Sequence, residues 1–243
     1  MTKLTITAFA TTLPQMKVIL FGASGMVGQG ALRECLLDPD VEAVLSVGRS
    51  ASGQHHAKLK ELVQQDVGDL AMIEQELRGY DACLFCLGVS SVGMSEEDYR
   101  RITYDLTLRV AQTLERVNPK MTFVYVSGGG TDSTEKGFSM WARVKGATEN
   151  ALLAMPFERA YMLRPGFIRP QHGIVSKTRW YRALYAVIGP IYPVLKRLFP
   201  GQVTTTEELG RAMLRLLKGG FRERVLENRD IVSLASSGPT LPA

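Results

Sequence analysis

Three glycines are spaced so that the backbone could approach a phosphate group. Gly22, Gly25 and Gly28 lie in "FGASGMVGQG", between an apolar strand pattern over 16–21 and a helical pattern over 26–37. Glycine permits a tight turn beside a pyrophosphate, and the helix N-terminus supplies N–H donors and positive potential. In this strand–helix context the spacing predicts a dinucleotide site, with a purely structural glycine turn as the alternative. The residues expected to face the cofactor are Gly22, Ser24, Gly25, Met26, Val27 and Gly28.

The end of the second apolar segment indicates which dinucleotide is preferred. NAD-binding folds usually carry a carboxylate there for the ribose hydroxyls, whereas NADP-binding folds offer a cation to the 2′-phosphate. The sequence at this point is "SVGRS", which contains Arg49 and no acid. This pattern favours NADP(H), with NAD(H) as the alternative cofactor and a solvated loop arginine as the alternative interpretation of Arg49.

Trp141 and Lys145 stand four residues apart in "SMWARVKGATEN". The segment has a helical pattern, so the two side chains share one stripe of the helix, beside its core stripe. Lys145 is therefore expected to point at a ligand, the alternative being a solvated surface lysine. Ser127 ends the apolar pattern over 121–127 just before three glycines, where it is either a functional hydroxyl or a turn residue.

Apolar segments alternate with helical patterns along most of the chain. This alternation predicts an α/β fold with a Rossmann-type, doubly wound parallel sheet. After Gly166 prolines interrupt the helical segments, which predicts a small, mostly helical C-terminal substrate cap from about residue 167 onward. Strands are expected over 16–21, 41–47, 59–65, 81–88, 121–127 and 159–166, and helices over 26–37, 69–78, 139–155 and 207–218, with a further helix starting at Ser95.

With these motifs in order, the chain resembles the atypical or extended short-chain dehydrogenase/reductase superfamily. More narrowly, it is similar to the branch with NAD-dependent epimerase/dehydratase-like proteins and Tat-interactive-protein-like oxidoreductases. The resemblance extends over about residues 16–234. It is carried by "GASGMVG", "CLG", "VSG", "VKG", "LRPGF" and "LENRDI". It implies a Rossmann fold with NADP bound across the carboxyl edge of the sheet.

The resemblance also implies roles for individual positions. Ser127 matches the serine that polarises the substrate carbonyl, and Lys145 matches the lysine that holds the nicotinamide ribose and lowers the pKa of a tyrosine. That tyrosine, of the family's Tyr-x-x-x-Lys, is replaced by Trp141. The positions matching cofactor contacts are Asp66 and Val67 at the adenine, Cys86, Leu87 and Gly88 over the adenine ribose, and Pro165 and Gly166 behind the nicotinamide.

The tryptophan removes the proton source that carbonyl reduction needs. An indole has one N–H donor and no accessible titration, so Trp141 can orient or stack on a substrate without delivering a proton. An oxidoreductase that uses another acid is favoured, with His172 in "RPQHG" as the stand-in. The alternatives are a non-catalytic NADP(H)-binding regulator or redox sensor, and an enzyme of altered chemistry on the same cofactor.

The basic residues are unevenly distributed. The segment from Arg159 to Thr206 has eight basic residues and no acid, whereas the rest of the chain has 21 basic and 24 acidic residues. With its aromatic residues, the part over 180–199 predicts a pocket for an apolar, anionic small molecule. A membrane-surface contact through 180–199 is the less favoured alternative. No nucleic-acid-binding motif accompanies the charge, and an oligomer is not excluded.

Composition limits the class of protein. The 243 residues suit a single NAD(P)-binding domain over 16–243, with 1–15 expected to be a disordered extension or an upstream start-codon artefact. Three cysteines cannot form a disulfide framework, which indicates a reducing compartment and favours a cytoplasmic protein. Cys83 and Cys86 are three apart in a strand pattern and face opposite sides, so no metal site is expected.

Overall fold

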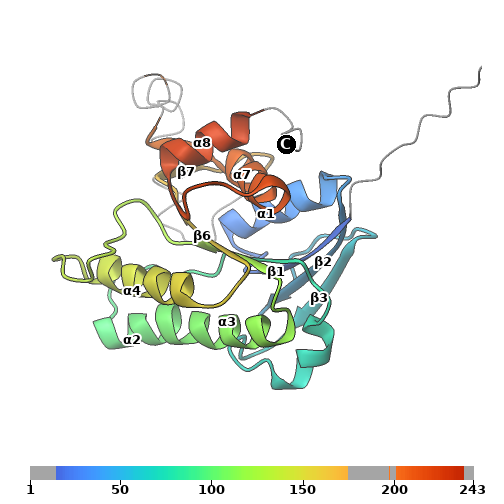
Figure 1. Cartoon of the computed structure of the whole chain (residues 1–243), viewed down its shortest axis with the longest axis horizontal. Coiled ribbons are helices and arrows are strands. Elements are labelled where there is room, and N and C mark those ends of the chain that lie inside the picture. Colours follow the sequence, from blue (N-terminus) through green and yellow to red (C-terminus); the bar gives the residue numbers. More distant parts are fainter. Residues whose placement is uncertain (1–14, 175–196, 198–200, 238–243) are drawn as a thin grey trace, which may run out of the picture.

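The computed structural model describes residues 15–174, 197 and 201–237. Its centre is a seven-stranded sheet in which every neighbouring pair is parallel, in the order β3-β2-β1-β4-β5-β6-β9 (Figure 1). This arrangement confirms the predicted Rossmann-type fold. The strands are β1 (Met16–Phe21), β2 (Val41–Gly48), β3 (Leu59–Val63), β4 (Ala82–Phe85), β5 (Thr122–Val126), β6 (Arg159–Arg164) and β9 (Val225–Glu227).

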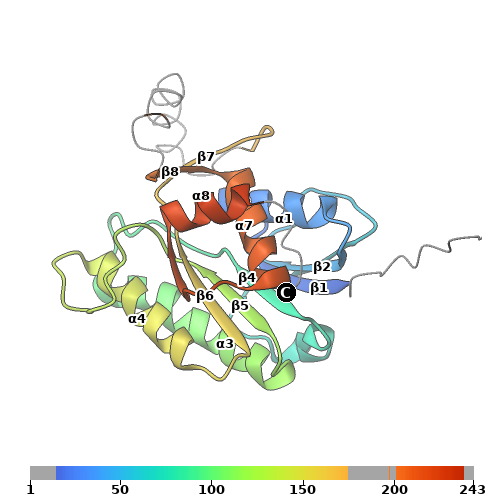
Figure 2. The ribbon, with the colours of Figure 1, turned by 45° about the horizontal axis from the view of Figure 1, so that its top comes forward.

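Helices cover both faces of the sheet (Figures 1 and 2). One face carries α1 (Met26–Leu37), α7 (Thr206–Gly219) and α8 (Asn228–Ser236). The other carries α3 (Leu106–Val117) and α4 (Met140–Ala154), with α2 (Glu96–Arg100) and the π-helical turn η2 (Arg101–Asp105) running directly into α3. The segment expected to be a helix over 69–78 is instead a 3₁₀ helix, η1 (Ala71–Leu77).

The central strands are buried on both faces, which explains their nearly continuous apolar runs. In β1, Val18 and Leu20 join the core under α1 and α7, whereas Ile19 and Phe21 join the core under α3 and α4. Successive side chains of a strand point to opposite faces, so one short run supplies both cores. The carboxyl ends of these strands meet along one edge of the sheet.

Residues from 167 onward contribute to the main sheet and its helical cover as well as to the expected cap region. β7 (Phe167–Arg169) pairs in parallel with β8 (Val203–Thr205) in a separate small sheet. α7 packs closely on α1, because a Cβ at Gly210 would lie only 2.7 Å from Glu34 Cγ. β9 then joins the main sheet beside β6. The expected ligand pocket over 180–199 lies outside the described residues, apart from position 197.

The three cysteines are free thiols. Burial raises the pKa of Cys35 to about 12, so this thiol stays protonated at neutral pH. In the described part of the chain, no group of three or more His, Cys, Asp or Glu side chains could hold a metal ion. Within the same residues, no helix is long and apolar enough to cross a membrane.

Candidate active site at the carboxyl edge of the sheet

The loop between β1 and α1 is shaped by glycines that leave no room for side chains. Gly22 has φ +85°, and a Cβ there would lie 2.9 Å from backbone atoms of Cys86 and Leu87. A Cβ at Gly28 would lie 2.0 Å from the carbonyl oxygen of Gly22. The loop after β4 is therefore pressed against the glycine loop, and only glycine fits where they touch.

The N-terminus of α1 is open to an anion. Its N-cap is Gly25, which offers no side-chain cap, and the first turn carries no acidic residue. The unpaired N–H groups of a helix start favour negative charge. Ser24 Oγ lies 3.4 Å from Ser50 Oγ, which joins this loop to the end of β2. Arg49 follows β2 directly, is exposed, and has no ion pair with another described residue.

The other residues expected at the adenine end line the same edge. Asp66 accepts a hydrogen bond from the backbone N–H of Gly68 at 2.8 Å, and Val67 is buried. At Gly88 a Cβ would meet no atom within 4 Å, so the position faces open space. Burial raises the pKa of the Cys86 thiol above its usual range, and the residue contributes to the site through its backbone beside Gly22.

At the chemistry end, Ser127 and Lys145 are brought together as expected, but through the serine backbone. Lys145 Nζ donates to the carbonyl oxygen of Ser127. The Ser127 hydroxyl is buried and points into the protein, with Oγ 2.5 Å from Glu149 Oε1 and 3.0 Å from the carbonyl oxygen of Leu163. That hydroxyl could polarise a substrate carbonyl only after leaving Glu149. Burial lowers the pKa of Lys145 to about 8, against the opposing charge of Glu149.

A buried ion-pair network lies behind Ser127 and Lys145, and the sequence motifs did not predict it. The Glu149 side chain is fully buried and accepts hydrogen bonds from Arg164 Nε at 3.1 Å and Arg164 Nη2 at 2.5 Å. Arg164 Nη1 also donates to Glu227 at 3.1 Å. The hydrogen bonds that Arg164 donates to Glu149 raise the pKa of Arg164 above its usual range. A signal was present, because Glu149 lies four residues after Lys145 on the same helical stripe.

Trp141 lies against the glycine loop that follows β5. A Cβ at Gly130 would lie 3.5 Å from Cη2 of the indole, and Gly130 has φ +85°. A Cβ at Gly128 would lie 3.8 Å from Lys145 Nζ. The indole therefore packs where a side chain at residue 130 would lie. Gly128 likewise has no side chain next to the ammonium group of Lys145. Trp141 itself is partly buried.

The turn after β6 completes this end of the site. The backbone N–H of Gly129 donates to the carbonyl oxygen of Pro165 at 2.7 Å. A Cβ at Gly166 would lie 2.2 Å from the carbonyl oxygen of Gln202, so this position also requires glycine. The structure thus places Pro165 and Gly166 next to the glycine loop after β5, against which Trp141 of α4 lies.

His172 lies apart from that group. It follows β7 with φ +54°, and its Nε2 is 2.7 Å from Glu207 Oε2 at the start of α7. The hydrogen bond to His172 holds the pKa of Glu207 below its usual range. Within the described residues, no hydrogen bond or ion pair links His172 to Trp141 or Lys145.

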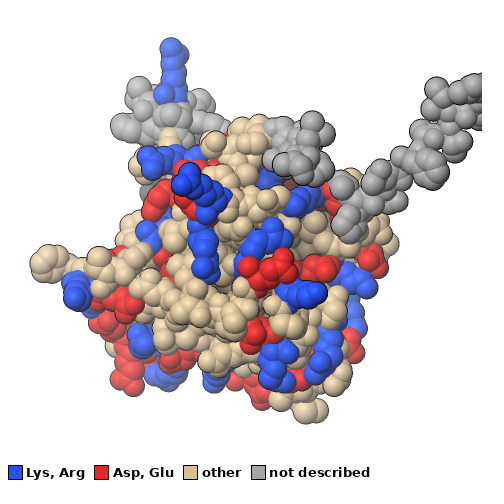
Figure 3. Space-filling model, in the orientation of Figure 1, with Lys and Arg blue, Asp and Glu red and all other residues tan. Residues whose placement is uncertain are grey.

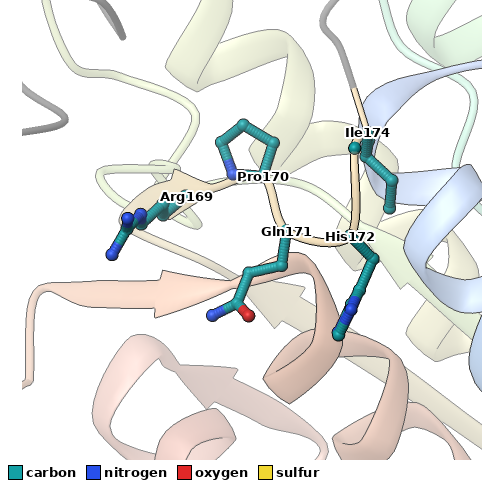
Figure 4. Close-up of a pocket in the computed structure, with 6 residues that line it drawn as sticks. Arg169, Pro170, Gln171, His172 and Ile174 are labelled. Carbon is teal, nitrogen blue, oxygen red and sulfur yellow. The ribbon is translucent and has the colours of Figure 1, made fainter.

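The loop with His172 borders a cavity of about 420 Å³, lined by residues 169–174. Gln171 and His172 extend to the same side of this loop (Figure 4). On the face drawn in Figure 3, acidic and basic side chains are interspersed and form no extended surface of one sign. A long cationic track of the kind that follows a nucleic-acid backbone is not present on that face.

Comparisons with known proteins identify close and distant relatives. The model of the NAD dependent epimerase/dehydratase family matches residues 18–135. Protein fmp52 of Emericella nidulans is 30% identical over 203 residues, which cover 80% of this chain and 84% of that protein. Protein FMP52 of Meyerozyma guilliermondii is 25% identical over 154 residues, 63% of this chain and 65% of that protein. This chain thus spans just under two thirds of the Meyerozyma relative.

Solved structures share the fold at low identity. The Bordetella bronchiseptica enzyme WbmF, solved in complex with NAD+, has a TM-score of 0.64 and 15% identity, over 92% of this chain and 78% of that one. A short chain dehydrogenase family protein from Francisella tularensis has a TM-score of 0.61 and 14% identity, over 85% of this chain and 92% of that one. Both likenesses support the Rossmann-type sheet.

The expectation of a cytoplasmic protein is wrong in light of these relatives, because both FMP52 proteins are named as mitochondrial. The expectation rested on the three cysteines, which cannot form a disulfide framework. Free thiols separate reducing from oxidising compartments. They do not distinguish one reducing compartment from another, which is why the inference failed.

Proposed function

Because the chain belongs to the NAD dependent epimerase/dehydratase family, we propose that it is an NADP(H)-binding oxidoreductase acting on an apolar, anionic small molecule. The dinucleotide would lie along the carboxyl edge of the sheet, with pyrophosphate at Gly22, Gly25 and Gly28. Lys145 would hold the nicotinamide ribose. Trp141 stands where a catalytic tyrosine would be, so reduction of ordinary carbonyl compounds is expected to be slow.

The glycine loop is the observation that carries this proposal. A pyrophosphate needs backbone N–H groups within reach and no side chains in the way. The positive φ of Gly22 and the 2.0 Å approach of a Cβ at Gly28 to the loop backbone meet the second condition. The uncapped start of α1 meets the first. These residues therefore fit a dinucleotide.

Arg49 supports NADP(H) over NAD(H). It is exposed beside the glycine loop and has no carboxylate partner among the described residues. A guanidinium can pair with a 2′-phosphate in a bidentate, charge-assisted geometry. NADPH should therefore bind more tightly than NADH.

Calorimetric titration with NADPH and NADH tests this preference. Arg49→Ala should weaken NADPH binding about tenfold or more, since hydrogen bonds to charged groups contribute roughly 1.5–3 kcal/mol. NADH binding should change little. Lys120→Ala is the matched control, because it removes an exposed cation just before β5, at the opposite edge of the sheet. Equal affinity of the wild-type protein for both cofactors would refute the assignment.

A non-catalytic NADP(H)-binding regulator is the second candidate. Two contacts favour it. The indole of Trp141 lies against Gly130, and the Ser127 hydroxyl is hydrogen-bonded to Glu149, so neither side chain supplies a proton to a substrate. The two candidates differ in turnover. A regulator would bind NADPH without oxidising it in the presence of any aldehyde or quinone.

A further inference from the structure

We propose that the ammonium group of Lys145 itself donates the proton during carbonyl reduction, and that Glu149 is the residue that positions it. The inference rests on the proposed function and assigns the acid within that same site. It replaces His172, whose ring is paired with Glu207. Lys145 then has two roles, in cofactor binding and in proton transfer.

Lys145 supplies an ammonium donor one helical turn after Trp141 on α4. One of its three N–H groups is taken by the carbonyl oxygen of Ser127, so two remain for ligands. Gly128 has no side chain to fill the position next to Nζ, where a Cβ would make an ordinary contact with Nζ at 3.8 Å. A substrate oxygen above Gly128 could therefore reach the ammonium group directly.

Glu149 fixes this geometry from behind. Its carboxylate accepts a hydrogen bond from the Ser127 hydroxyl at 2.5 Å. This bond holds Ser127 in place, and the carbonyl oxygen of Ser127 in turn orients Lys145 Nζ. Arg164 anchors the same carboxylate and is itself held by Glu227. Helix α4 and strands β5, β6 and β9 are thus joined into one frame. Glu149 touches no ligand position and acts through Ser127, so it is a positioning residue.

In the described part of the chain, few charges lie around Lys145. On α4 the charged neighbour is Glu149, and from β6 comes Arg164, which the carboxylates of Glu149 and Glu227 balance. In the loop after β5, the Asp132 carboxylate accepts hydrogen bonds from its own loop, which lower its pKa. The pKa of Lys145 near 8 makes the ammonium group mostly protonated at neutral pH, and a stronger acid than an ordinary lysine.

The proton step balances without a further reagent. A reduced nicotinamide, when bound, would supply the hydride. As the new C–H bond forms, the carbonyl π electrons move onto the substrate oxygen. That oxygen takes a proton from Lys145 Nζ, and the neutral amine regains a proton from water.

Three variants test the proposal. Lys145→Arg keeps a cation and its donors, but a guanidinium cannot release its proton. It should bind NADPH within a few-fold of wild type by calorimetry and lose about 100-fold or more in the rate of phenanthrenequinone reduction. In the wild type this rate should fall as the pH rises through about 8, where the ammonium group deprotonates.

The positioning role has a readout that does not depend on turnover. After reductive methylation with ¹³C-formaldehyde, NMR titration should give Lys145 a pKa well below that of surface lysines. Glu149→Gln should lower this pKa further, since the carboxylate charge raises it. Glu227→Gln is the matched control, because it removes the other carboxylate on Arg164 without contacting Ser127.

The outcomes distinguish a failure of the proposed function from a failure of the roles proposed for Lys145 and Glu149. If NADPH does not bind the wild-type protein, the proposed function fails. If NADPH binds but Lys145→Arg keeps the wild-type rate, or Lys145 titrates like a surface lysine, the proton-donor role alone is overturned. Equal shifts in Glu149→Gln and Glu227→Gln overturn the positioning role. Binding of NADPH without reduction of the quinone at any pH counts against Lys145 as an effective donor.

Discussion

At the β1–α1 end of the carboxyl edge, the site is made of backbone; at the β5–α4 end, it is made of side chains. Gly22 and Gly28 shape the loop because they have no side chains; a Cβ at either position would clash with main-chain atoms. Lys145, Glu149 and Arg164 define the other end by hydrogen bonds and ion pairs. A backbone site depends on the fold and survives most sequence change. A side-chain site can change its chemistry by a single substitution while the fold persists.

The largest effect is expected from breaking the side-chain end at its buried ion pair. Arg164→Met leaves the fully buried Glu149 carboxylate without its main partner. Removing one member of a buried pair typically costs about 3–5 kcal/mol. Urea denaturation should therefore show a large loss in the free energy of unfolding. The double variant with Glu149→Gln should recover much of it; if it is no more stable than Arg164→Met, the pair is not the cause.

A smaller loss is expected at the backbone end. Gly28→Ala places a Cβ 2.0 Å from the carbonyl oxygen of Gly22, so the loop must shift. Overpacking of this kind costs about 1–3 kcal/mol, and the displaced loop should no longer bind NADPH measurably. Gly48→Ala is the control, because a Cβ there meets its nearest atom at 3.6 Å. An unchanged NADPH affinity in Gly28→Ala would contradict the loop assignment.

Trp141→Tyr should sharpen the comparison by restoring chemistry without changing the fold. A phenol next to Lys145 can donate a proton, so NADPH-dependent reduction of an aldehyde or quinone panel should rise about tenfold. The gain is expected to be modest because the Ser127 hydroxyl stays with Glu149. Trp141→Phe opens similar space without an acid and controls for the steric part. If both variants raise the reduction rate equally, the indole only blocked substrate access and the phenol adds no proton transfer.

The smallest effect is expected at His172. Glu207 has a lowered pKa in the folded protein, so its stabilising effect is present above its unfolded pKa and is lost as the pH falls through the folded one. His172→Ala should remove about 0.5–1 kcal/mol of this stability near neutral pH. It should leave quinone reduction unchanged. A large loss of turnover in His172→Ala would restore this histidine as the acid.

The same contrast explains how much could be predicted from the sequence. Apolar runs such as "MKVILF" and the spacing of Gly22, Gly25 and Gly28 are local signals, and they predicted the fold and the tight glycine loop after the first strand. The partner of the Ser127 hydroxyl was not predictable in this way. It depends on where Glu149, 22 residues away, points after α4 packs on the sheet.

Short elements of secondary structure were not predicted from the sequence for a related reason. β9 has three residues, Val225–Glu227, which is too few for any periodic pattern to register. Its place in the sheet is set by pairing with β6, where Leu163 lies opposite Leu226. The 3₁₀ form of Ala71–Leu77 likewise depends on local hydrogen bonding that a hydrophobic pattern does not distinguish from an α-helix.

The late position of β9 and α7 in the chain has a consequence for synthesis. α7 contacts α1 so closely that a Cβ at Gly30 would lie 2.6 Å from the carbonyl oxygen of Thr206. β9 closes the sheet beside β6. A nascent chain on the ribosome therefore carries the glycine loop long before its apolar support exists. Until about residue 227 has emerged, one face of β1 and β4 is covered by α1 alone and is partly open to aggregation. The glycine loop is made early, yet the domain becomes stable only after α7 and β9 have been synthesised.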